Sequence, residues 1–288
     1  MGCNNHLPVC CCGDSSIDQE DPRLALLDTL CGFYVEALDR LPIHDYPNLV
    51  HCLSVAGHCN GLLEPVCNII LHAIAHGGPS DLQGPYKRED ITAEFLSKIR
   101  SSWYWLRTSE RSLDGLTAFL MSWYRYLTLD QAVGYLYLAK ADLYLAMDLV
   151  EREYHTQCVV EEALPPPAFD DDAWFLTIRD SLMYAALAAE HPNPDGLVAL
   201  ATETFGADHV DKIAAWLLHA DQVCRKITVD DIYNSLMHGR APDGQYLYSL
   251  RLSYPDTDGC QNLNTCIHRC SSLLCWDSAE HNVSPAIT

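Results

Sequence analysis

The stretch DPRLALLDTLCGFYVEALDRLP, residues 21–42, sets the fold class of this 288-residue chain. Asp21 followed by Pro22 is a helix start, because aspartate caps a first turn and proline lacks only an N–H that has no partner there. Apolar residues then recur at steps of three and four: Leu24, Leu27, Cys31, Val35 and Leu38. This spacing predicts one apolar helix face, and Pro42 ends the helix.

The same signals recur along the chain. We expect helices at residues 47–57 and 66–76, from Thr92 onward, and at 112–127, 128–154, 174–190, 195–204 and 209–226, with a short helix capped by Thr228. The echo of residues 136–139 in 143–146 predicts one packed face on the helix 128–154. Only Gln245 to Leu252 alternates as a strand does. The fold class is therefore all-α, a multi-helix globular bundle.

The chain divides by composition into three parts. Residues 1–19 are polar and Cys-rich, which predicts a disordered tail, and residues 239–288 predict an irregular Cys-rich extension. Between them lies a helical domain, residues 20–238. The segment 156–172, with its runs of proline and aspartate, is a linker that would subdivide this domain.

The charge balance excludes several classes of partner. The chain carries 18 Lys and Arg against 39 Asp and Glu, a formal net charge of −21, so nucleic acid is not expected as a partner. No apolar run is long enough to span a bilayer, and residues 1–16 do not read as a signal peptide. We therefore expect a cytoplasmic location, with most of the 14 cysteines reduced. No cofactor-binding pattern is found.

The stretch Gly57-His58-Cys59-Asn60-Gly61 is the sharpest catalytic pattern, because it matches a nucleophile elbow with Cys59 as nucleophile. An elbow needs a strand before it and a parallel sheet around it. The alternative is a helix end and turn in which the two glycines adopt unusual φ values. The turn is the favoured interpretation.

Histidines and cysteines form three candidate metal sites. His51-Cys52 and His58-Cys59 stand seven residues apart, about 10.5 Å along a helix, which is too wide for one zinc ion unless the chain bends at Gly57. Buried thiols and capped histidines are the favoured interpretation of these four residues. His72 and His76 share a helix face, but Ala73 replaces the zincin glutamate, and His76 suits the helix C-terminal dipole. The densest cluster, with partly suitable zinc spacing, is Cys260, Cys266, Cys270 and Cys275 with His268. A reduced thiol-rich extension is favoured over zinc there.

Met1-Gly2-Cys3 resembles a dual-acylation start, with myristate on Gly2 and palmitate on Cys3. His6 stands where the myristoylation pattern has Ser or Thr, so an unmodified tail is favoured. Acylation would attach the protein peripherally to a membrane.

Aromatic residues at helical spacing are expected in the core rather than in a ligand pocket: Trp103, Trp105, Trp123, Tyr124 and Tyr126. The run Asp170-Asp171-Asp172 is expected to cap a helix that starts at Ala173 rather than to bind a cation.

Three stretches carry a family resemblance: residues 31–42 (CGFYVEALDRLP), 61–70 (GLLEPVCNII) and 111–120 (RSLDGLTAFL), the last continuing into 124–127 (YRYL). Together they resemble the plant PIR-two-like helical domain family, over roughly residues 20–235, which includes the stretches 191–194 (HPNP) and 227–231 (ITVDD). The resemblance implies an all-helical fold and a plant source. It implies no catalytic residues.

The function that these observations favour is a non-enzymatic protein–protein interaction module with an acidic surface. One alternative is a lipid-anchored signalling accessory, which depends on Gly2 and Cys3. The other is an enzyme that uses Cys59 in a helical pocket.

Overall fold

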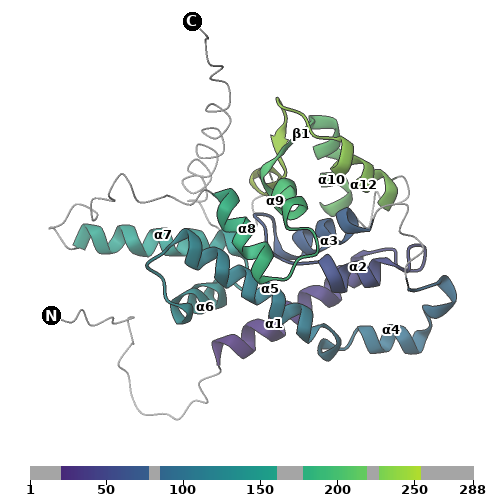
Figure 1. Cartoon of the computed structure of the whole chain (residues 1–288), viewed down its shortest axis with the longest axis horizontal. Helices are drawn as coiled ribbons and strands as arrows, with labels where there is room; N and C mark the ends of the chain where they lie inside the picture. The colour runs from purple at the N-terminus through teal and green to yellow at the C-terminus, as the bar shows by residue number, and fades with distance from the viewer. Residues whose placement is uncertain (1–20, 78–84, 161–177, 219–226, 254–288) are drawn as a thin grey trace, which may run out of the picture.

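The computed structural model describes residues 21–77, 85–160, 178–218 and 227–253 (Figure 1). The helices are α1 (Pro22–Arg40), α2 (Leu49–Ala56), α3 (Pro65–His76), α4 (Ala93–Ile99), α5 (Ser102–Trp123), α6 (Leu129–Leu138), α7 (Leu143–Val160), α8 (Ile178–Ala188), α9 (Pro194–Thr202), α10 (Ala207–Leu218), α12 (Val229–His238) and α13 (Leu250–Ser253), with the short 3₁₀ turns η2 (Arg88–Asp90) and η3 (Leu247–Ser249). The predicted all-α fold class is confirmed. The tail at 1–19, residues 161–172 of the linker and residues 254–288 lie outside the described residues.

Several helices begin where capping residues predicted them. The Asp21 side chain accepts a hydrogen bond from the Arg23 N–H at 2.9 Å, and Pro22 opens α1. Thr128 and Thr228 each form a capping box at the start of α6 and α12. These caps act within four residues, which is why the sequence alone could locate them.

The helix predicted at 128–154 is in fact two helices, and this prediction was wrong. Lys140 and Ala141 have positive φ values of 51° and 60°, so the chain turns after α6. Asp142 then starts α7 by accepting a hydrogen bond from the Leu145 N–H at 3.0 Å. The echoing segments 136–139 and 143–146 therefore lie on either side of a turn rather than on one helix face.

The central helix α5 packs against α1, α6 and α8 (Figure 1). A helix start predicted at Ser112 was wrong, because α5 runs through this position without interruption. Ser112 is fully buried, and its hydroxyl contacts other side chains instead of capping a helix. A serine in mid-helix was thus mistaken for a boundary.

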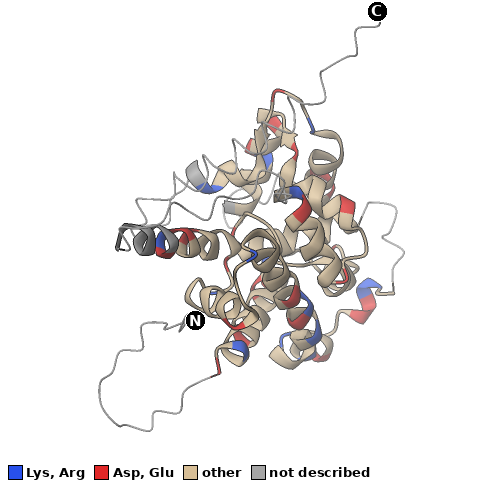
Figure 2. Cartoon of the chain, turned by 60° about the vertical axis from the view of Figure 1, so that its left-hand side comes forward, with Lys and Arg blue, Asp and Glu red and all other residues tan. Residues whose placement is uncertain are grey.

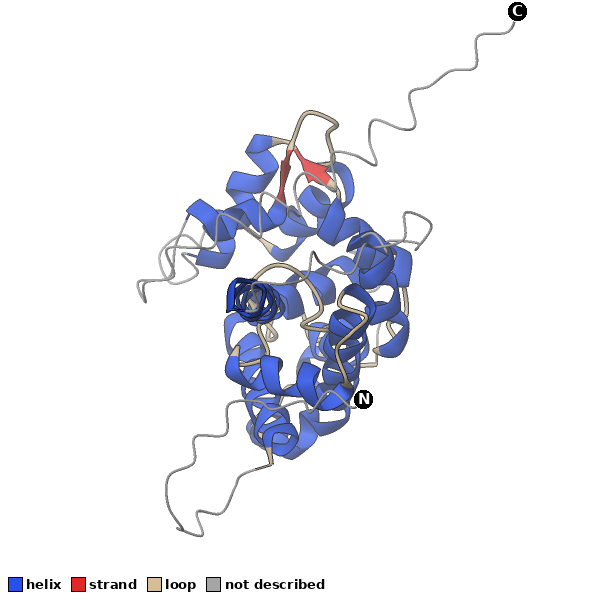
Figure 3. Ribbon diagram, turned by 90° about the vertical axis from the view of Figure 1, so that its left-hand side faces the viewer, coloured by secondary structure: helices blue, strands red, loops and turns tan. Residues whose placement is uncertain are grey.

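The strand predicted at 245–252 is only two residues long. β2 (Gln245–Tyr246) pairs antiparallel with β1 (Thr204–Phe205), and these short strands lie at one end of an otherwise helical body (Figure 3). The chain then turns helical, which allows the adjacent residues Leu247 and Tyr248 both to be buried. In the described part of the extension predicted to be irregular, residues 239–244 form a loop with one isolated bridge, and residues 245–253 form short regular elements.

One hydrophobic cluster joins buried residues from Leu26 to Tyr248, on both sides of the linker predicted at 156–172. Residues 156–160 of that linker belong to α7. Arg251 of α13 reaches back to the Asp142 carboxylate, with one N–O distance of 2.9 Å. None of the described helices is both long and apolar enough to cross a bilayer.

Candidate functional site: a buried polar node

The loop of residues 57–61 follows a helix, α2, and not a strand, so the nucleophile-elbow hypothesis is excluded and the turn is confirmed. The Gly57 N–H donates to the carbonyls of Cys52 and Leu53. The expected unusual φ is not found, since Gly57 has φ −73°. Glycine is needed here for space: a Cβ at Gly57 would lie 2.8 Å from the Leu53 oxygen, and one at Gly61 would lie 2.5 Å from Asn68 Oδ1.

Ser112 of α5 joins this loop to α1. Its hydroxyl lies 2.7 Å from the Tyr34 hydroxyl and 3.4 Å from His58 Nδ1, and it accepts a hydrogen bond from the Cys59 N–H at 3.4 Å. Asn68 of α3 holds the other side of the loop by donating to the Cys59 and Leu63 carbonyls. The loop is thus held directly by side chains from α5 and α3, and Ser112 links it to Tyr34 of α1.

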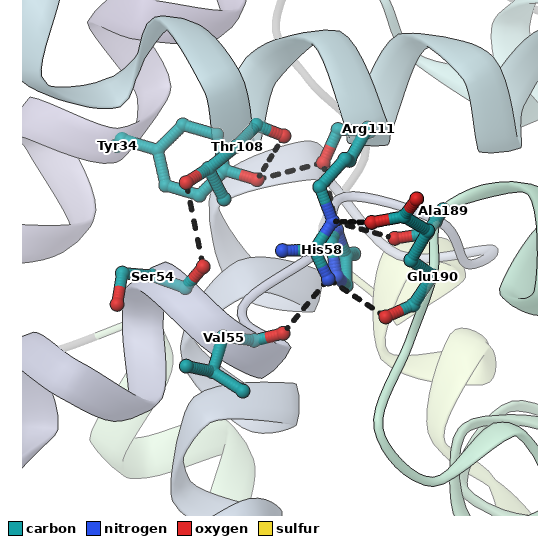
Figure 4. Close-up of polar contacts among 9 residues, drawn as sticks. Tyr34, Ser54, Val55, His58, Thr108, Arg111, Ala189 and Glu190 are labelled. Carbon is teal, nitrogen blue, oxygen red and sulfur yellow. Dashed lines mark hydrogen bonds and ion pairs between the residues drawn. The ribbon is translucent and has the colours of Figure 1, made fainter.

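Arg111, one residue before Ser112, binds the ends of two further helices (Figure 4). Its guanidinium donates to the carbonyls of Ala189 at 3.0 Å and Glu190 at 2.7 Å, which follow α8. It also donates to the Val55 carbonyl of α2 at 3.4 Å. A positive charge is favourable there, because helix C-termini carry partial negative charge. Arg111 therefore ties α5 to α2 and α8.

Three buried imidazoles complete the site. The His191 ring centroid lies 5.4 Å from that of His58 and 5.8 Å from that of His72. His72 Nδ1 donates to the His58 carbonyl at 2.7 Å, and His191 Nε2 donates to the Ala56 carbonyl at 3.2 Å. We call Arg111, Ser112, His58, His72 and His191 together the polar node.

Burial keeps these histidines neutral at pH 7. It lowers the pKa of His72 to about 3 and that of His191 to about 4, and the pKa of His58 lies well below its ordinary value. Neighbouring imidazoles add to the effect on His58 and His72, because a second positive charge nearby would repel the first.

Cys59 beside the node is a thiol and not a thiolate. Its side chain is 1% exposed, and burial raises its pKa to about 12. Nucleophilic cysteines need the thiolate and access to the substrate. In this structure Cys59 is neither a thiolate nor accessible to a substrate.

The candidate metal ligands named from the sequence lie partly within and partly outside the described residues. Among the residues that the structure describes, which include His51, Cys52, His58 and Cys59, no group of three or more His, Cys, Asp or Glu side chains is placed to hold a metal ion. His72 lies in the node, while His76 lies in the last turn of α3, as predicted. The remaining candidates lie outside the described residues: Gly2, Cys3, Cys260, Cys266, Cys270, Cys275, His268 and residues 170–172.

The aromatic residues divide between core and surface. Trp105 is fully buried, stacks on Tyr34 with ring centroids 5.3 Å apart, and donates its indole N–H to the Ile99 carbonyl. Trp103 and Tyr126 are 82% and 56% exposed, so the core prediction was wrong for these two. Trp103 stands two residues, about 200°, around the helix from Trp105, and so faces the other way.

Sequence reasoning did not identify Arg111, Ser112 or His191 as parts of a site. His191 lies 80 positions from Arg111 in the chain, and no local spacing pattern could pair them. The one signal was the family resemblance: Arg111 and Ser112 open one of its stretches, and His191 opens another, residues 191–194.

Comparison with known proteins identifies a family domain that contains most of the polar node. Residues 28–151 match a family model described as "PIR2-like, helical domain", a shorter span than the 20–235 expected. No curated protein and no solved structure matches the chain. The matched span runs from α1 into α7 and includes four of the five node residues, whereas His191 lies beyond it. Residues 28–151 of this chain are therefore a PIR2-like helical domain.

Proposed function

We propose that the protein is a non-enzymatic helical interaction module that binds a protein partner through the outer face of α8. The observation that carries this proposal is the exposure of two large apolar side chains on that face. Tyr184 is 52% exposed and Leu187 is 58% exposed. They stand three residues apart and therefore lie side by side on the helix.

The inner face of α8 is already occupied by the core. Ser181, Leu182, Ala185 and Ala186 are buried there against α5 and α9. A helix with apolar residues on both faces is typical of one that is covered on both faces. Tyrosine at the centre of a protein interface also contributes strongly to affinity.

The charge of the chain favours a partner with basic residues around an apolar contact. The formal net charge is −21, and acidic and basic positions are interspersed along the described helices (Figure 2). Opposite charge at the rim of an interface mainly speeds association. The burial and raised pKa of Cys59 support a module that does no covalent chemistry.

The test is quantitative capture of partners from plant extract with a C-terminal tag, comparing Leu187→Glu with Leu24→Glu. Leu24, on α1, is 62% exposed and so is a matched control. We expect a stoichiometric partner with the wild type and with Leu24→Glu, and its loss with Leu187→Glu. A partner retained by Leu187→Glu contradicts binding through α8. A protein recovered alone, with and without detergent, contradicts the interaction module itself.

A further inference from the structure

Four buried polar atoms near the node have no hydrogen-bond partner among the described residues. They are both amide atoms of Asn60, the hydroxyl oxygen of Ser181 and Nε2 of His58. All three side chains belong to fully buried residues. Asn60 is the most unusual of them, because neither its donor nor its acceptor is satisfied.

Asn60 lies where α5 and α8 approach each other. A Cβ at Gly115 of α5 would lie 2.0 Å from Asn60 Nδ2 and 2.9 Å from the Ala185 oxygen of α8. Ser181 stands four residues before Ala185, on the same face of α8. His58 is two residues from Asn60 in the same loop. Three of the four atoms thus belong to residues 57–61, and the fourth belongs to the inner face of α8, whose Ala185 lies close to Asn60 across Gly115. We call this boundary between residues 57–61 and α8 the seam.

Buried polar groups in proteins almost always have a partner, because an unpaired one loses its hydrogen bonds to water without replacement. The Asn60 amide needs both a donor and an acceptor, and the Ser181 hydroxyl can serve as either. Water can supply both at once. The zero exposure of these residues leaves no route for a larger ligand.

We propose that the seam is a binding site for internal water, which bridges the Asn60 amide and the Ser181 hydroxyl and also contacts His58 Nε2. This water fastens residues 57–61 of the PIR2-like domain to α8, which lies beyond the matched span. It supplements the direct bonds from Arg111 to the end of α8, and it is independent of what binds the outer face of that helix.

The first measurement is on the wild-type protein, by high-resolution crystallography. We expect an ordered water oxygen within about 3 Å of both Asn60 and Ser181. A seam without solvent density overturns the proposal. This result does not depend on any variant folding.

The second measurement is a double-mutant cycle with Asn60→Leu and Ser181→Ala, read by urea unfolding. We expect each single change to raise the unfolding equilibrium constant about tenfold, and the pair to do little more than either, because both bind the same water. If the seam holds no water, Asn60→Leu should stabilise the protein, and that result would overturn the proposal. Changes in the free energy of unfolding that simply add in the double variant would also overturn it.

Ser235→Ala is the matched control. Ser235 is also buried, but its hydroxyl donates to the Asp231 carbonyl within α12. The change in the free energy of unfolding caused by Ser235→Ala should therefore add to the change caused by Asn60→Leu.

Discussion

At the residue scale, Arg111 binds three carbonyls from two helix ends, and its side chain is 19% exposed. We expect Arg111→Met to lower the free energy of unfolding by about 2 kcal/mol, because those carbonyls lose a charged donor. Urea denaturation at pH 7 measures this change. Arg100, which binds Asp39 on the surface and is 52% exposed, is the control, and Arg100→Met should cost less than about 1 kcal/mol. Equal losses in the two variants would show that Arg111 has no special role.

The three node histidines predict an acid-sensitive fold. In the unfolded chain a histidine titrates near pH 6.5, whereas in the folded protein the pKa values of His191 and His72 are about 4 and 3. Between these values the unfolded state binds more protons, so stability falls as the pH falls from 6.5 towards 4. We expect a loss of about 2 kcal/mol or more between pH 7 and 5.

Urea denaturation at a series of pH values checks this dependence. His72→Asn keeps a donor for the His58 carbonyl and should flatten the pH dependence, whereas His51→Asn on the exposed side of α2 should leave it unchanged. A stability that is constant from pH 7 to 5 would show that the imidazoles titrate normally in the folded state.

Cys59 should resist thiol reagents in the native protein, because burial raises its pKa to about 12. We expect its labelling, followed by mass spectrometry of peptides, to become fast only at urea concentrations that unfold the chain. Rapid labelling of Cys59 in native buffer would contradict this expectation and would support the alternative of an enzyme that uses Cys59.

At the element scale, the turn after α6 is a feature that local sequence signals could not predict. Helix starts at Asp21, Thr128 and Thr228 were predicted because a cap acts on its nearest neighbours. The break at Lys140 and Ala141 was not, since neither residue is glycine and both favour helices. Part of what fixes this turn is Arg251, 109 positions later, which binds Asp142. Such a distant partner leaves no local signal.

The positive φ of Lys140 gives a test of this turn. Glycine adopts that conformation without steric cost, so Lys140→Gly should leave the free energy of unfolding unchanged or slightly raised. Arg107→Gly, at an exposed position inside α5, should lower it by about 1 kcal/mol. Thermal denaturation of both variants distinguishes the two environments. A similar loss in both would place Lys140 in an ordinary helical conformation.

At the scale of the whole molecule, the polar node joins the PIR2-like domain to the helices beyond residue 151. The helical class and most helix positions followed from local periodicity and caps. The node did not, because its residues come from positions 58 to 191 and meet only after α2, α3, α5 and α8 have packed. The exposed face of α8 was missed for the same reason: only packing shows which side of an apolar helix is left outside.

The most direct test of this joint is native-state hydrogen exchange of α5 and α8 in the wild type and in Arg111→Met. If the node makes one cooperative unit, the most protected amides of both helices should exchange through openings of the same free energy. Arg111→Met should then lower both by the same amount. If α8 opens at a lower free energy than α5, and Arg111→Met leaves that difference unchanged, the node does not join the two parts of the protein.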